Sequence, residues 1–374
     1  MTTFIYGFPP SIEDAPLIST SELDQLVGSN SGNLAFCYAL WRQLGGVPTK
    51  MWLEEKSQYF QKGNTAVMAL ANQIGSHADM GFFADALEKN PVNLVGVGLG
   101  AQASIGGEVE IPEGTQRWLK LIQERRPSDF PNLGLRGDFT QNALKKIGLH
   151  ENTEVLGCPT LFISPEKYLG KVIKKKWNKK ISSIAVAAGH PSWSGLAKIE
   201  HSLCKILDGG SDYITQSPKL MLEFGRGCDT SILDSDLESI RNYCMPNMNL
   251  DQFKMWGIKH AVTFFSAPAW MEHLKRFDFV IGTRIHGVML ALQVGVPGIC
   301  IAHDSRTKEL CETMHVPMIE AKYILNGFSI KEFRDFVKFD DKLFDENRAN
   351  LGFKYSEFMK NNKIQISKIN NYFK

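Results

Sequence analysis

The fold is decided by residues 277–287, which read Phe-Asp-Phe-Val-Ile-Gly-Thr-Arg-Ile-His-Gly. The apolar residues at 277–281 predict a short buried strand, after which the chain turns and an apolar helix follows at 288–294. Gly295 ends that helix, and a second apolar strand is predicted at 298–302. Two strands that are joined through a helix run parallel, so we expect their carboxyl ends at the same edge of one sheet.

Polar side chains follow both predicted strands. Arg284 and His286 come after the first strand, and His303, Asp304 and Arg306 come after the second. We expect these five residues to converge on one crevice, because open α/β sheets bind ligands beyond the carboxyl ends of their strands. An arginine fork and a helix N-terminus both favour anions that carry carboxylate or phosphate oxygens. A solvated loop is the plain alternative for the Arg-x-His pair, but the polar cluster at the neighbouring strand end favours a site.

Strands and helices alternate along the rest of the chain, and a length of 374 residues favours two domains. We predict an α/β fold in which two Rossmann-like domains, at 1–170 and 181–374, face each other across a cleft. The Lys-rich segment 165–180 is predicted to be a solvated linker between them. The chain beyond Pro317 is predicted to be helical, with segments at 329–339, at 342–353 and from 355 onward.

Five further polar residues stand at predicted turns, strand ends or helix starts and are candidates for ligand contacts: Asn33, Asn72, Arg136, His190 and Arg226. Each also has a plain structural explanation. Asn33 lies where a helix is capped, and Asn72 lies in what could be a solvated loop. Arg136 could form an internal ion pair, His190 could cap a turn, and Arg226 stands in an ordered turn between two glycines.

The composition bears on location and partners. Lys and Arg number 42 against 40 Asp and Glu, so the net charge of +2 gives no reason to expect a nucleic-acid partner. Residues 1–10 lack the regions of a secretory signal, and no apolar run approaches the roughly 20 residues of a membrane span, so we expect a cytoplasmic protein. The seven cysteines lack metal-ligand spacing, so we expect reduced thiols and no metal. The basic tail 360–374 leaves open a peripheral contact with the inner face of the membrane.

A resemblance to the polysaccharide pyruvyltransferase family rests on consecutive features: the motif Gly-Thr-Arg-Ile-His-Gly at 282–287, the apolar helix, Gly-Val-Pro at 295–297 and the strand after it. The similarity is specific over 277–318 and loose elsewhere. Members of this family resemble two-domain glycosyltransferases of the GT-B type. The chain departs from the family pattern in two places. Asn33 stands where the family tends to have aspartate, and no glycine run follows the predicted strand at 67–71.

This resemblance implies that the protein transfers a pyruvyl group from phosphoenolpyruvate to a sugar as a ketal, in exopolysaccharide or capsule biosynthesis. It implies phosphoenolpyruvate as a co-substrate and no further cofactor. The acceptor is a sugar, and a lipid-linked oligosaccharide is left open. The first domain is then the expected acceptor side, and the second domain is the expected phosphoenolpyruvate side.

The resemblance also suggests roles for the candidate residues. Arg284 and the helix N-terminus are expected to bind phosphoenolpyruvate, with Arg226 or Arg306 as a second clamp. His286 is the first choice for the general acid or base and His190 the second, because histidine titrates near neutral pH. The helix dipole and a bound phosphate shift the pKa of His286 in opposite directions, so we expect that pKa near neutrality.

The remaining assignments concern orientation and substrate contacts. Asp304 is expected to orient a histidine or to accept a proton from a sugar hydroxyl. Further substrate contacts are assigned to four residues: His303, Asn33, Asn72 and Arg136.

Two other functions fit the same sequence. Two facing α/β domains also suit a GT-B glycosyltransferase that uses a nucleotide sugar, which would release a nucleoside diphosphate where a pyruvyltransferase releases phosphate. A non-catalytic member that binds glycans is the third reading, and the presence of both Arg284 and His286 argues against it.

Overall fold

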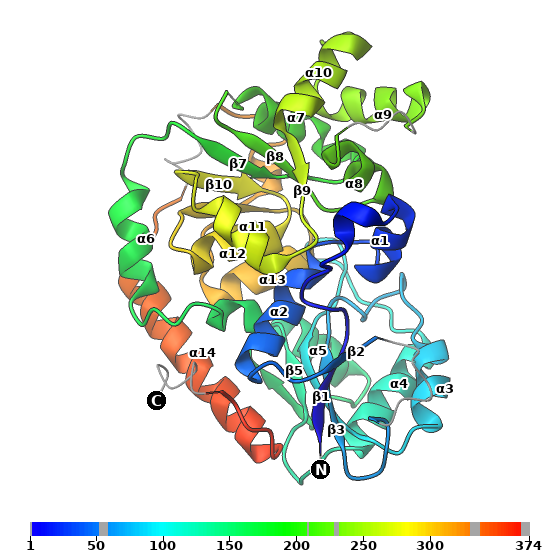
Figure 1. Cartoon of the computed structure of the whole chain (residues 1–374). Helices are drawn as coiled ribbons and strands as arrows, with labels where there is room; N and C mark the ends of the chain where they lie inside the picture. Colours follow the sequence, from blue (N-terminus) through cyan, green and yellow to red (C-terminus); the bar gives the residue numbers. More distant parts are fainter. Residues whose placement is uncertain (1, 52–58, 208, 228–231, 330–336, 368–374) are drawn as a thin grey trace.

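The computed structural model describes residues 2–51, 59–207, 209–227, 232–329 and 337–367. It contains two six-stranded sheets in which every strand pairs in parallel with its neighbours (Figure 1). Helices pack around both sheets, as parallel sheets require, because their strands are buried on both faces. The predicted α/β architecture with two Rossmann-like halves is therefore confirmed. The domain limits at 170 and 181 stay a prediction.

The first sheet has the order β2-β1-β3-β4-β5-β6. Its strands are β1 Thr3–Tyr6, β2 Thr49–Lys50, β3 Thr65–Ala69, β4 Asn93–Leu99, β5 Leu133–Leu135 and β6 Thr153–Val155. The helices of this half are α1 Thr20–Leu26, α2 Asn33–Gln43, α3 Gly81–Glu88, α4 Glu113–Glu124 and α5 Asp138–Lys146. The apolar helix that the sequence predicts after Asn33 is α2, and seven of its residues are buried.

The second sheet has the order β12-β11-β10-β7-β8-β9. Its strands are β7 Ile184–Ala187, β8 Asp212–Thr215, β9 Ala261–Thr263, β10 Phe279–Gly282, β11 Gly298–Ala302 and β12 Met318–Glu320. The order of the strands reverses between β10 and β7, which is the switch point at which such sheets open a crevice. A Cβ at Gly282 would lie 2.1 Å from the carbonyl oxygen of Ala187, so only glycine fits at the end of β10.

The helices of the second half surround this sheet. They are α6 Leu169–Trp177, α7 Ala197–Lys205, α8 Lys219–Gly225, α9 Asp234–Cys244, α10 Leu250–His260, α11 Ala267–Leu274, α12 Ile285–Gln293, α13 Ser305–Met314 and α14 Asp341–Asn361. The central one is α12, which is buried on nearly every side and contacts α2 of the first half as well as its own sheet. A single apolar core therefore runs through both halves.

The carboxyl ends of the strands in the two sheets face each other. The backbone amide of Ala103, beyond β4, donates to Ser305 Oγ over 2.9 Å, and the amide of Ser305 donates to the Ala103 carbonyl over 3.1 Å. Glu309 of α13 accepts hydrogen bonds from Thr140 of α5, from the backbone amide at 2.6 Å and from the hydroxyl at 2.8 Å. These bonds hold the loops after β4 and β5 against the start of α13.

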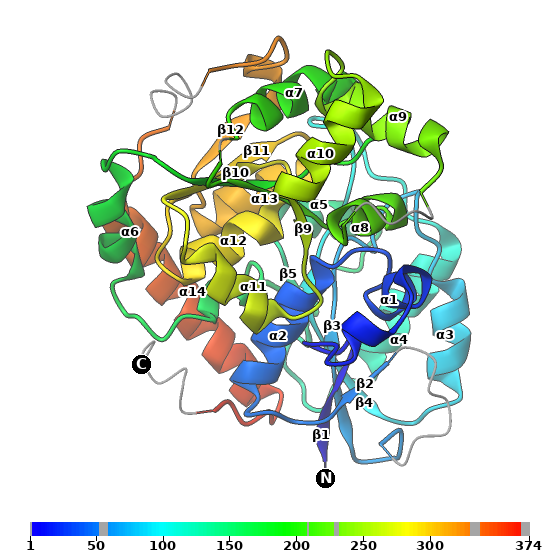
Figure 2. The same ribbon diagram turned by 45° about the horizontal axis from the view of Figure 1, so that its top comes forward.

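Helix α14 crosses back from the second half to the first (Figures 1 and 2). It packs along α6, and Lys174 Nζ of α6 donates to the Phe339 carbonyl just before α14 over 2.6 Å. Buried Arg348 of α14 donates three hydrogen bonds to backbone carbonyls of the segment 161–166: from Nε to Leu161 at 2.9 Å, from Nη1 to Glu166 at 2.6 Å and from Nη2 to Ser164 at 2.5 Å. One guanidinium group thus fastens the last helix to the chain that leaves the first sheet.

Three sequence predictions for these segments need correction. The Lys-rich segment is not an open linker, because it contains α6, whose buried stripe includes Ile173 and Trp177 while most of its lysines lie on the opposite face. The two helices expected at 342–353 and from 355 onward are one helix, α14. Residues 318–320 form strand β12 rather than a helix. The helix expected at 329–339 and the end of the basic tail lie mostly outside the described residues.

Candidate active site

The site lies where β10 and β7 end side by side. Arg284 is the residue before the first turn of α12, and His286 lies within that turn. His190 follows β7, and residues 303–306 follow β11. The structure therefore brings together Arg284, His286, His303, Asp304 and Arg306, as parallel pairing of these strands requires.

Three arginines surround the site. Arg284 and Arg306 come from the second half, and Arg136 comes from the end of β5 in the first half. Burial, together with the positive charge of Arg306, lowers the pKa of Arg284 to about 10. Burial likewise lowers the pKa of Arg136 to about 10, and Arg306 again contributes. The three positive charges repel one another, which an anionic ligand would relieve.

Several N–H groups of these arginines are buried and unused. Within the described part of the chain, Arg284 Nε and Nη2, Arg306 Nε and Arg136 Nη2 have no hydrogen-bond partner. The Nε of Arg136 is occupied by the Gly98 carbonyl at 2.7 Å. Buried donors without acceptors destabilise a protein unless a ligand or water satisfies them. An anion with several oxygens would satisfy these donors.

His286 lies at the junction of the two halves. Its ring centroid is 5.3 Å from that of Phe36 in α2, and its Nε2 is 3.8 Å from Cys158 Sγ. Burial lowers the pKa of His286 well below its ordinary value, and Arg136, Arg306 and Arg284 lower it further. The expected pKa near neutrality depends on a bound anion, and it stays a prediction. Without such an anion, burial and the three positive charges hold the pKa of His286 low.

Trp193 contacts three of the site residues that come from the second half of the protein. The centroid of its ring lies 4.3 Å from that of His303 and 5.5 Å from that of His190, and Arg284 Cζ lies over the ring at 4.7 Å from its centroid. Burial lowers the pKa of both histidines to about 4, and the charge of Arg284 adds to this for His190. Trp193 is not among the candidate residues that the sequence analysis named. Its contacts show that it orders Arg284 through a cation–π interaction.

Asp304 organises the start of α13. Its carboxylate accepts from the backbone amide of Thr307 at 2.8 Å and from the Thr307 hydroxyl at 2.6 Å, which closes a capping box. Its other oxygen lies 3.2 Å from Arg306 Nη2 and 3.7 Å from His303 Nε2. Burial alone would raise the pKa of Asp304, but Arg306, His303 and Thr307 together lower it. Asp304 thus orients Arg306 and stands beside His303.

Arg226 is placed differently from the other candidate arginines. Its Nη1 donates to the Ile18 carbonyl at 3.1 Å and to Thr20 Oγ1 at 3.0 Å, and its Nη2 donates to the Ala15 carbonyl at 3.1 Å. The fork that was proposed as a second clamp is therefore used to hold the segment before α1. The arginines that the structure groups with Arg284 are Arg306 and Arg136.

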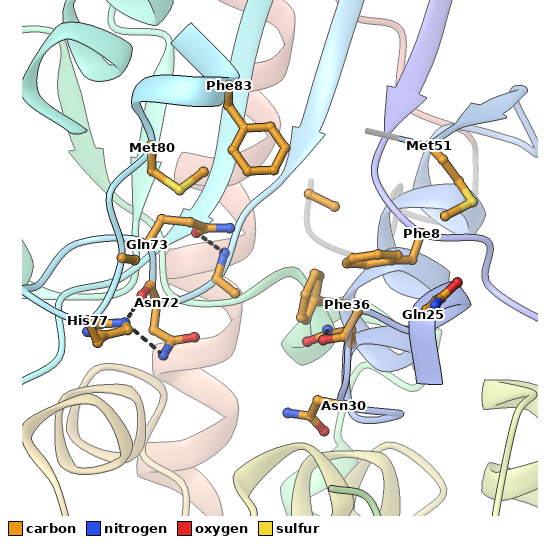
Figure 3. Close-up of a pocket in the computed structure, with 15 residues that line it drawn as sticks. Phe8, Gln25, Asn30, Phe36, Met51, Asn72, Gln73, His77, Met80 and Phe83 are labelled. Atoms are coloured by element: carbon orange, nitrogen blue, oxygen red, sulfur yellow. Dashed lines mark hydrogen bonds between the residues drawn. The ribbon is translucent and has the colours of Figure 1, made fainter. Parts of the chain in front are cut away.

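Asn33 and Asn72 line a cavity of about 500 Å³ in the first half (Figure 3). Asn33 Nδ2 donates to the Val27 carbonyl at 2.8 Å. Asn72 Nδ2 donates to Gln102 Oε1, and the Asn72 carbonyl lies 2.8 Å from His77 Nε2. Phe36 lines the same cavity and also contacts His286. The cavity therefore borders the charged site through one aromatic ring.

A buried carboxylate that the sequence did not reveal lies behind His190. Glu200 of α7 accepts from the Gly189 amide at 2.9 Å, from Tyr213 OH at 2.5 Å and from Tyr243 OH at 3.4 Å. Burial raises the pKa of Glu200, while these bonds and the charge of Arg284 lower it. In the sequence, Glu200 is one polar residue of an amphipathic helix, and only the fold shows that it faces inward.

The contact between Glu309 and Thr140 predicts a pH-dependent stability. Burial raises the pKa of Glu309 from its ordinary value of 4.5 to about 7, against the lowering effect of the Thr140 bonds and Arg136; Asp138 raises it slightly. Between these two values the folded protein keeps a proton that the unfolded chain releases. This stabilisation is complete below pH 4.5 and is lost as pH rises through 7, by up to about 1.4 kcal/mol per pH unit.

We expect Glu309→Gln to remove this pH dependence. Chemical denaturation of the parent and the variant between pH 5 and 8 measures this dependence. The unfolding free energy of the variant minus that of the parent should increase as pH rises. Glu312→Gln is the matched control, since Glu312 lies on the same helix with a side chain that is 56% exposed. Parallel stability curves for parent and Glu309→Gln would contradict the shifted pKa.

In the residues that the structure describes, no group of three or more His, Cys, Asp or Glu side chains could hold a metal ion. No helix in the same residues is both long and apolar enough to cross a membrane.

Comparison with known proteins gives one family. The model of the family described as polysaccharide pyruvyl transferase matches residues 30–305. No curated protein sequence matches the chain. Similar solved structures include a functionally uncharacterised protein from Klebsiella pneumoniae, with 10% identity, 86% of this chain and 93% of that chain covered, and a TM-score of 0.42. HepE from Anabaena in complex with UDP has 10% identity, coverage of 97% and 98%, and a TM-score of 0.42.

A third solved structure is a protein from Glycyrrhiza uralensis in complex with glycyrrhetinic acid 3-O-monoglucuronide. It has 12% identity, covers 97% of this chain and 90% of that chain, and has a TM-score of 0.33. Scores of this size are too low to support an argument about the present chain.

Proposed function

Since the chain belongs to the polysaccharide pyruvyl transferase family, we propose that it transfers a pyruvyl group from phosphoenolpyruvate to a sugar as a cyclic ketal, in exopolysaccharide or capsule biosynthesis. The observation that carries this proposal is the group of three arginines whose buried N–H donors have no partner within the described residues. Phosphoenolpyruvate has a carboxylate and a phosphate, and its two anionic groups match the charge and the donors of the cluster.

The donor is held from three directions. Arg284 and the first amides of α12 reach it from β10, Arg306 from α13 and Arg136 from the first half. Trp193 fixes the plane of the Arg284 guanidinium, and Asp304 fixes that of Arg306. Because Arg136 comes from the opposite half, a bound donor also draws the two halves together.

The reaction balances without an oxidant or reductant. A first sugar hydroxyl adds to C2 of the enol: a C–O bond forms, the hydroxyl loses its proton, and the methylene carbon gains one and becomes a methyl group. The bond between C2 and the phosphate oxygen then breaks, and phosphate leaves with the electron pair. A second hydroxyl attacks the resulting oxocarbenium carbon, and its proton leaves with the phosphate. The products are the ketal and inorganic phosphate.

We assign the first proton transfer to His286. A neutral imidazole has one nitrogen that accepts a proton and one that donates a proton, so the ring can take the hydroxyl proton and supply the methylene carbon. This relay starts from the uncharged ring, which is the form that the lowered pKa of His286 favours. The ring lies between the arginines and Phe36, which borders the cavity.

The proposed function is tested by incubating the protein with phosphoenolpyruvate and a panel of sugar acceptors while inorganic phosphate and the product are measured. We expect acceptor-dependent phosphate release and a product that is heavier by the pyruvyl group. Release of a nucleoside diphosphate from a nucleotide sugar, with no turnover of phosphoenolpyruvate, would identify a glycosyltransferase instead.

Donor binding gives a direct test of the arginine cluster. We expect Arg284→Lys to weaken phosphoenolpyruvate binding by roughly 1.5–3 kcal/mol, although the charge is kept, because lysine cannot make the forked contact or lie flat on Trp193. Isothermal titration calorimetry measures the affinity. Arg226→Lys is the matched control, since the Arg226 fork already binds the segment 15–20. Equal losses in both variants would show that the effect does not come from this site.

A further inference from the structure

The cavity beside His286 has an unusual lining for a protein that handles a dianion. Figure 3 draws 15 residues around it, and none of them is Asp, Glu, Lys or Arg. The polar residues are amides and one histidine: Gln25, Asn30, Asn33, Asn72, Gln73 and His77. Its volume of about 500 Å³ falls in the usual range for sites that bind small molecules.

The cavity has two different walls. On one side, the rings of Phe8 and Phe36 lie close together, from the loop after β1 and from α2 (Figure 3). On the other side, Asn72, Gln73 and His77 project from the loop after β3. The Gln73 Oε1 is occupied by the Ala71 amide at 2.6 Å, which leaves the Gln73 amide hydrogens to face the cavity. Aromatic faces opposite hydrogen-bonding amides match a pyranose, whose C–H face is apolar and whose edge carries hydroxyls.

We infer that this cavity binds the acceptor as an uncharged pyranose ring that packs its C–H face on Phe8 and Phe36 and bonds its hydroxyls to Asn72 and Gln73. The proposal rests on the proposed function for the identity of the ligand as acceptor. It goes further in naming the acceptor class, because a uronic acid or a sugar phosphate is excluded. Among the residues that the structure describes, the lining has no Lys or Arg side chain, so a carboxylate in this cavity would lose its hydration without gaining a cation from them, which is costly.

The separation between the uncharged cavity and the arginine cluster also keeps the acceptor out of the donor site. An acidic acceptor would compete with phosphoenolpyruvate for Arg136, Arg284 and Arg306, since these are the cations at the junction of the halves. A neutral acceptor in the cavity leaves the arginines to the donor. Phe36 contacts both the cavity and His286, so hydroxyls at that end of a bound ring face the proposed proton relay.

Binding of matched glycosides to the full-length protein, in the absence of phosphoenolpyruvate, tests this inference. The probes are the methyl β-glycosides of glucose, galactose and mannose and their 6-uronates, followed by saturation-transfer NMR and titration. We expect at least one neutral glycoside to bind, and its uronate to bind at least about tenfold more weakly. Phe8→Leu keeps an apolar side chain over Gly28 and should weaken the neutral glycoside several-fold.

A gain of function completes the test. Gln25 is exposed at the edge of the cavity, so the protein should tolerate Gln25→Lys. The new positive charge should improve binding of the uronate and leave binding of the neutral glycoside unchanged. Gln365→Lys is the control for net charge, because Gln365 is exposed beyond α14. Equal or tighter binding of the uronate to the parent, absence of binding by every neutral glycoside, or equal effects of the two lysine variants would overturn the inference.

The outcomes separate this inference from the proposed function. Phosphate release from phosphoenolpyruvate that occurs only with acidic acceptors would keep the pyruvyl transfer and reject the neutral cavity. Neutral glycosides that bind as expected in a protein that never consumes phosphoenolpyruvate would keep the cavity assignment as a sugar site and reject the transfer.

Discussion

Replacement of His286 by alanine is expected to lower single-turnover pyruvyl transfer by about 10²–10⁴-fold, the usual contribution of a positioned acid or base. Affinity for phosphoenolpyruvate should stay close to that of the parent, because the three arginines and the amides at the start of α12 remain. The physical reason is the position of the ring. It touches Phe36 at the edge of the cavity, and the charges of the arginine cluster reach it from the other side.

Rapid-quench transfer together with calorimetric donor binding measures both quantities. His303→Ala serves as a comparison, since the His303 ring contacts Trp193, as Arg284 does, and is not assigned a proton. A His286→Ala protein that binds the donor normally and turns over within a few-fold of the parent would remove His286 from the mechanism and leave His190 as the next candidate. Loss of donor binding would instead make His286 a ligand of the anion.

Replacement of Arg348 by methionine should destabilise the protein by roughly 2–6 kcal/mol, because two buried carbonyls each lose a donor at about 1–3 kcal/mol. Arg348 is 1% exposed, and its guanidinium satisfies the carbonyls of Leu161, Ser164 and Glu166. Methionine fills much of the space but donates no hydrogen bond, so the carbonyls of Leu161 and Ser164 stay buried without this donor, and that of Glu166 also loses its bond. Thermal and chemical unfolding of purified variants measures the loss.

Lys342→Met is the matched control, because it makes a similar change at an exposed position of the same helix. We expect it to stay within about 0.5 kcal/mol of the parent, as surface substitutions usually do. An Arg348→Met protein as stable as Lys342→Met would show that water or a neighbouring donor replaces the guanidinium, and α14 would then be held by apolar packing alone.

The centre of the second half could be predicted from the sequence because it is a local unit. The stretch 277–302 contains a strand, a helix and a strand, and parallel pairing then requires Arg284 and the residues after Ala302 to meet. The fold class followed from the same alternation elsewhere. In the first half, Asn33 and Asn72 were selected as polar residues near strand or helix ends, and both line the cavity.

What could not be predicted depends on residues far apart in the chain. The fork of Arg226 binds carbonyls about 200 positions earlier, and nothing near Arg226 distinguishes that use from binding a ligand. The shifted pKa of His286 depends on Arg136, which comes from the other half. Strand β12 has three residues, too few to show a period, so its parallel pairing with β11 decides its structure.

The packing of α14 along α6 limits how the two halves can move. The chain passes between the halves twice, once before β7 and once before α14, and the bond from Lys174 to the Phe339 carbonyl joins the two passages. Two further contacts join the halves, where Ser305 meets Ala103 and where Glu309 meets Thr140. Displacement of one half against the other would therefore have to break hydrogen bonds of buried groups as well as strain both passages.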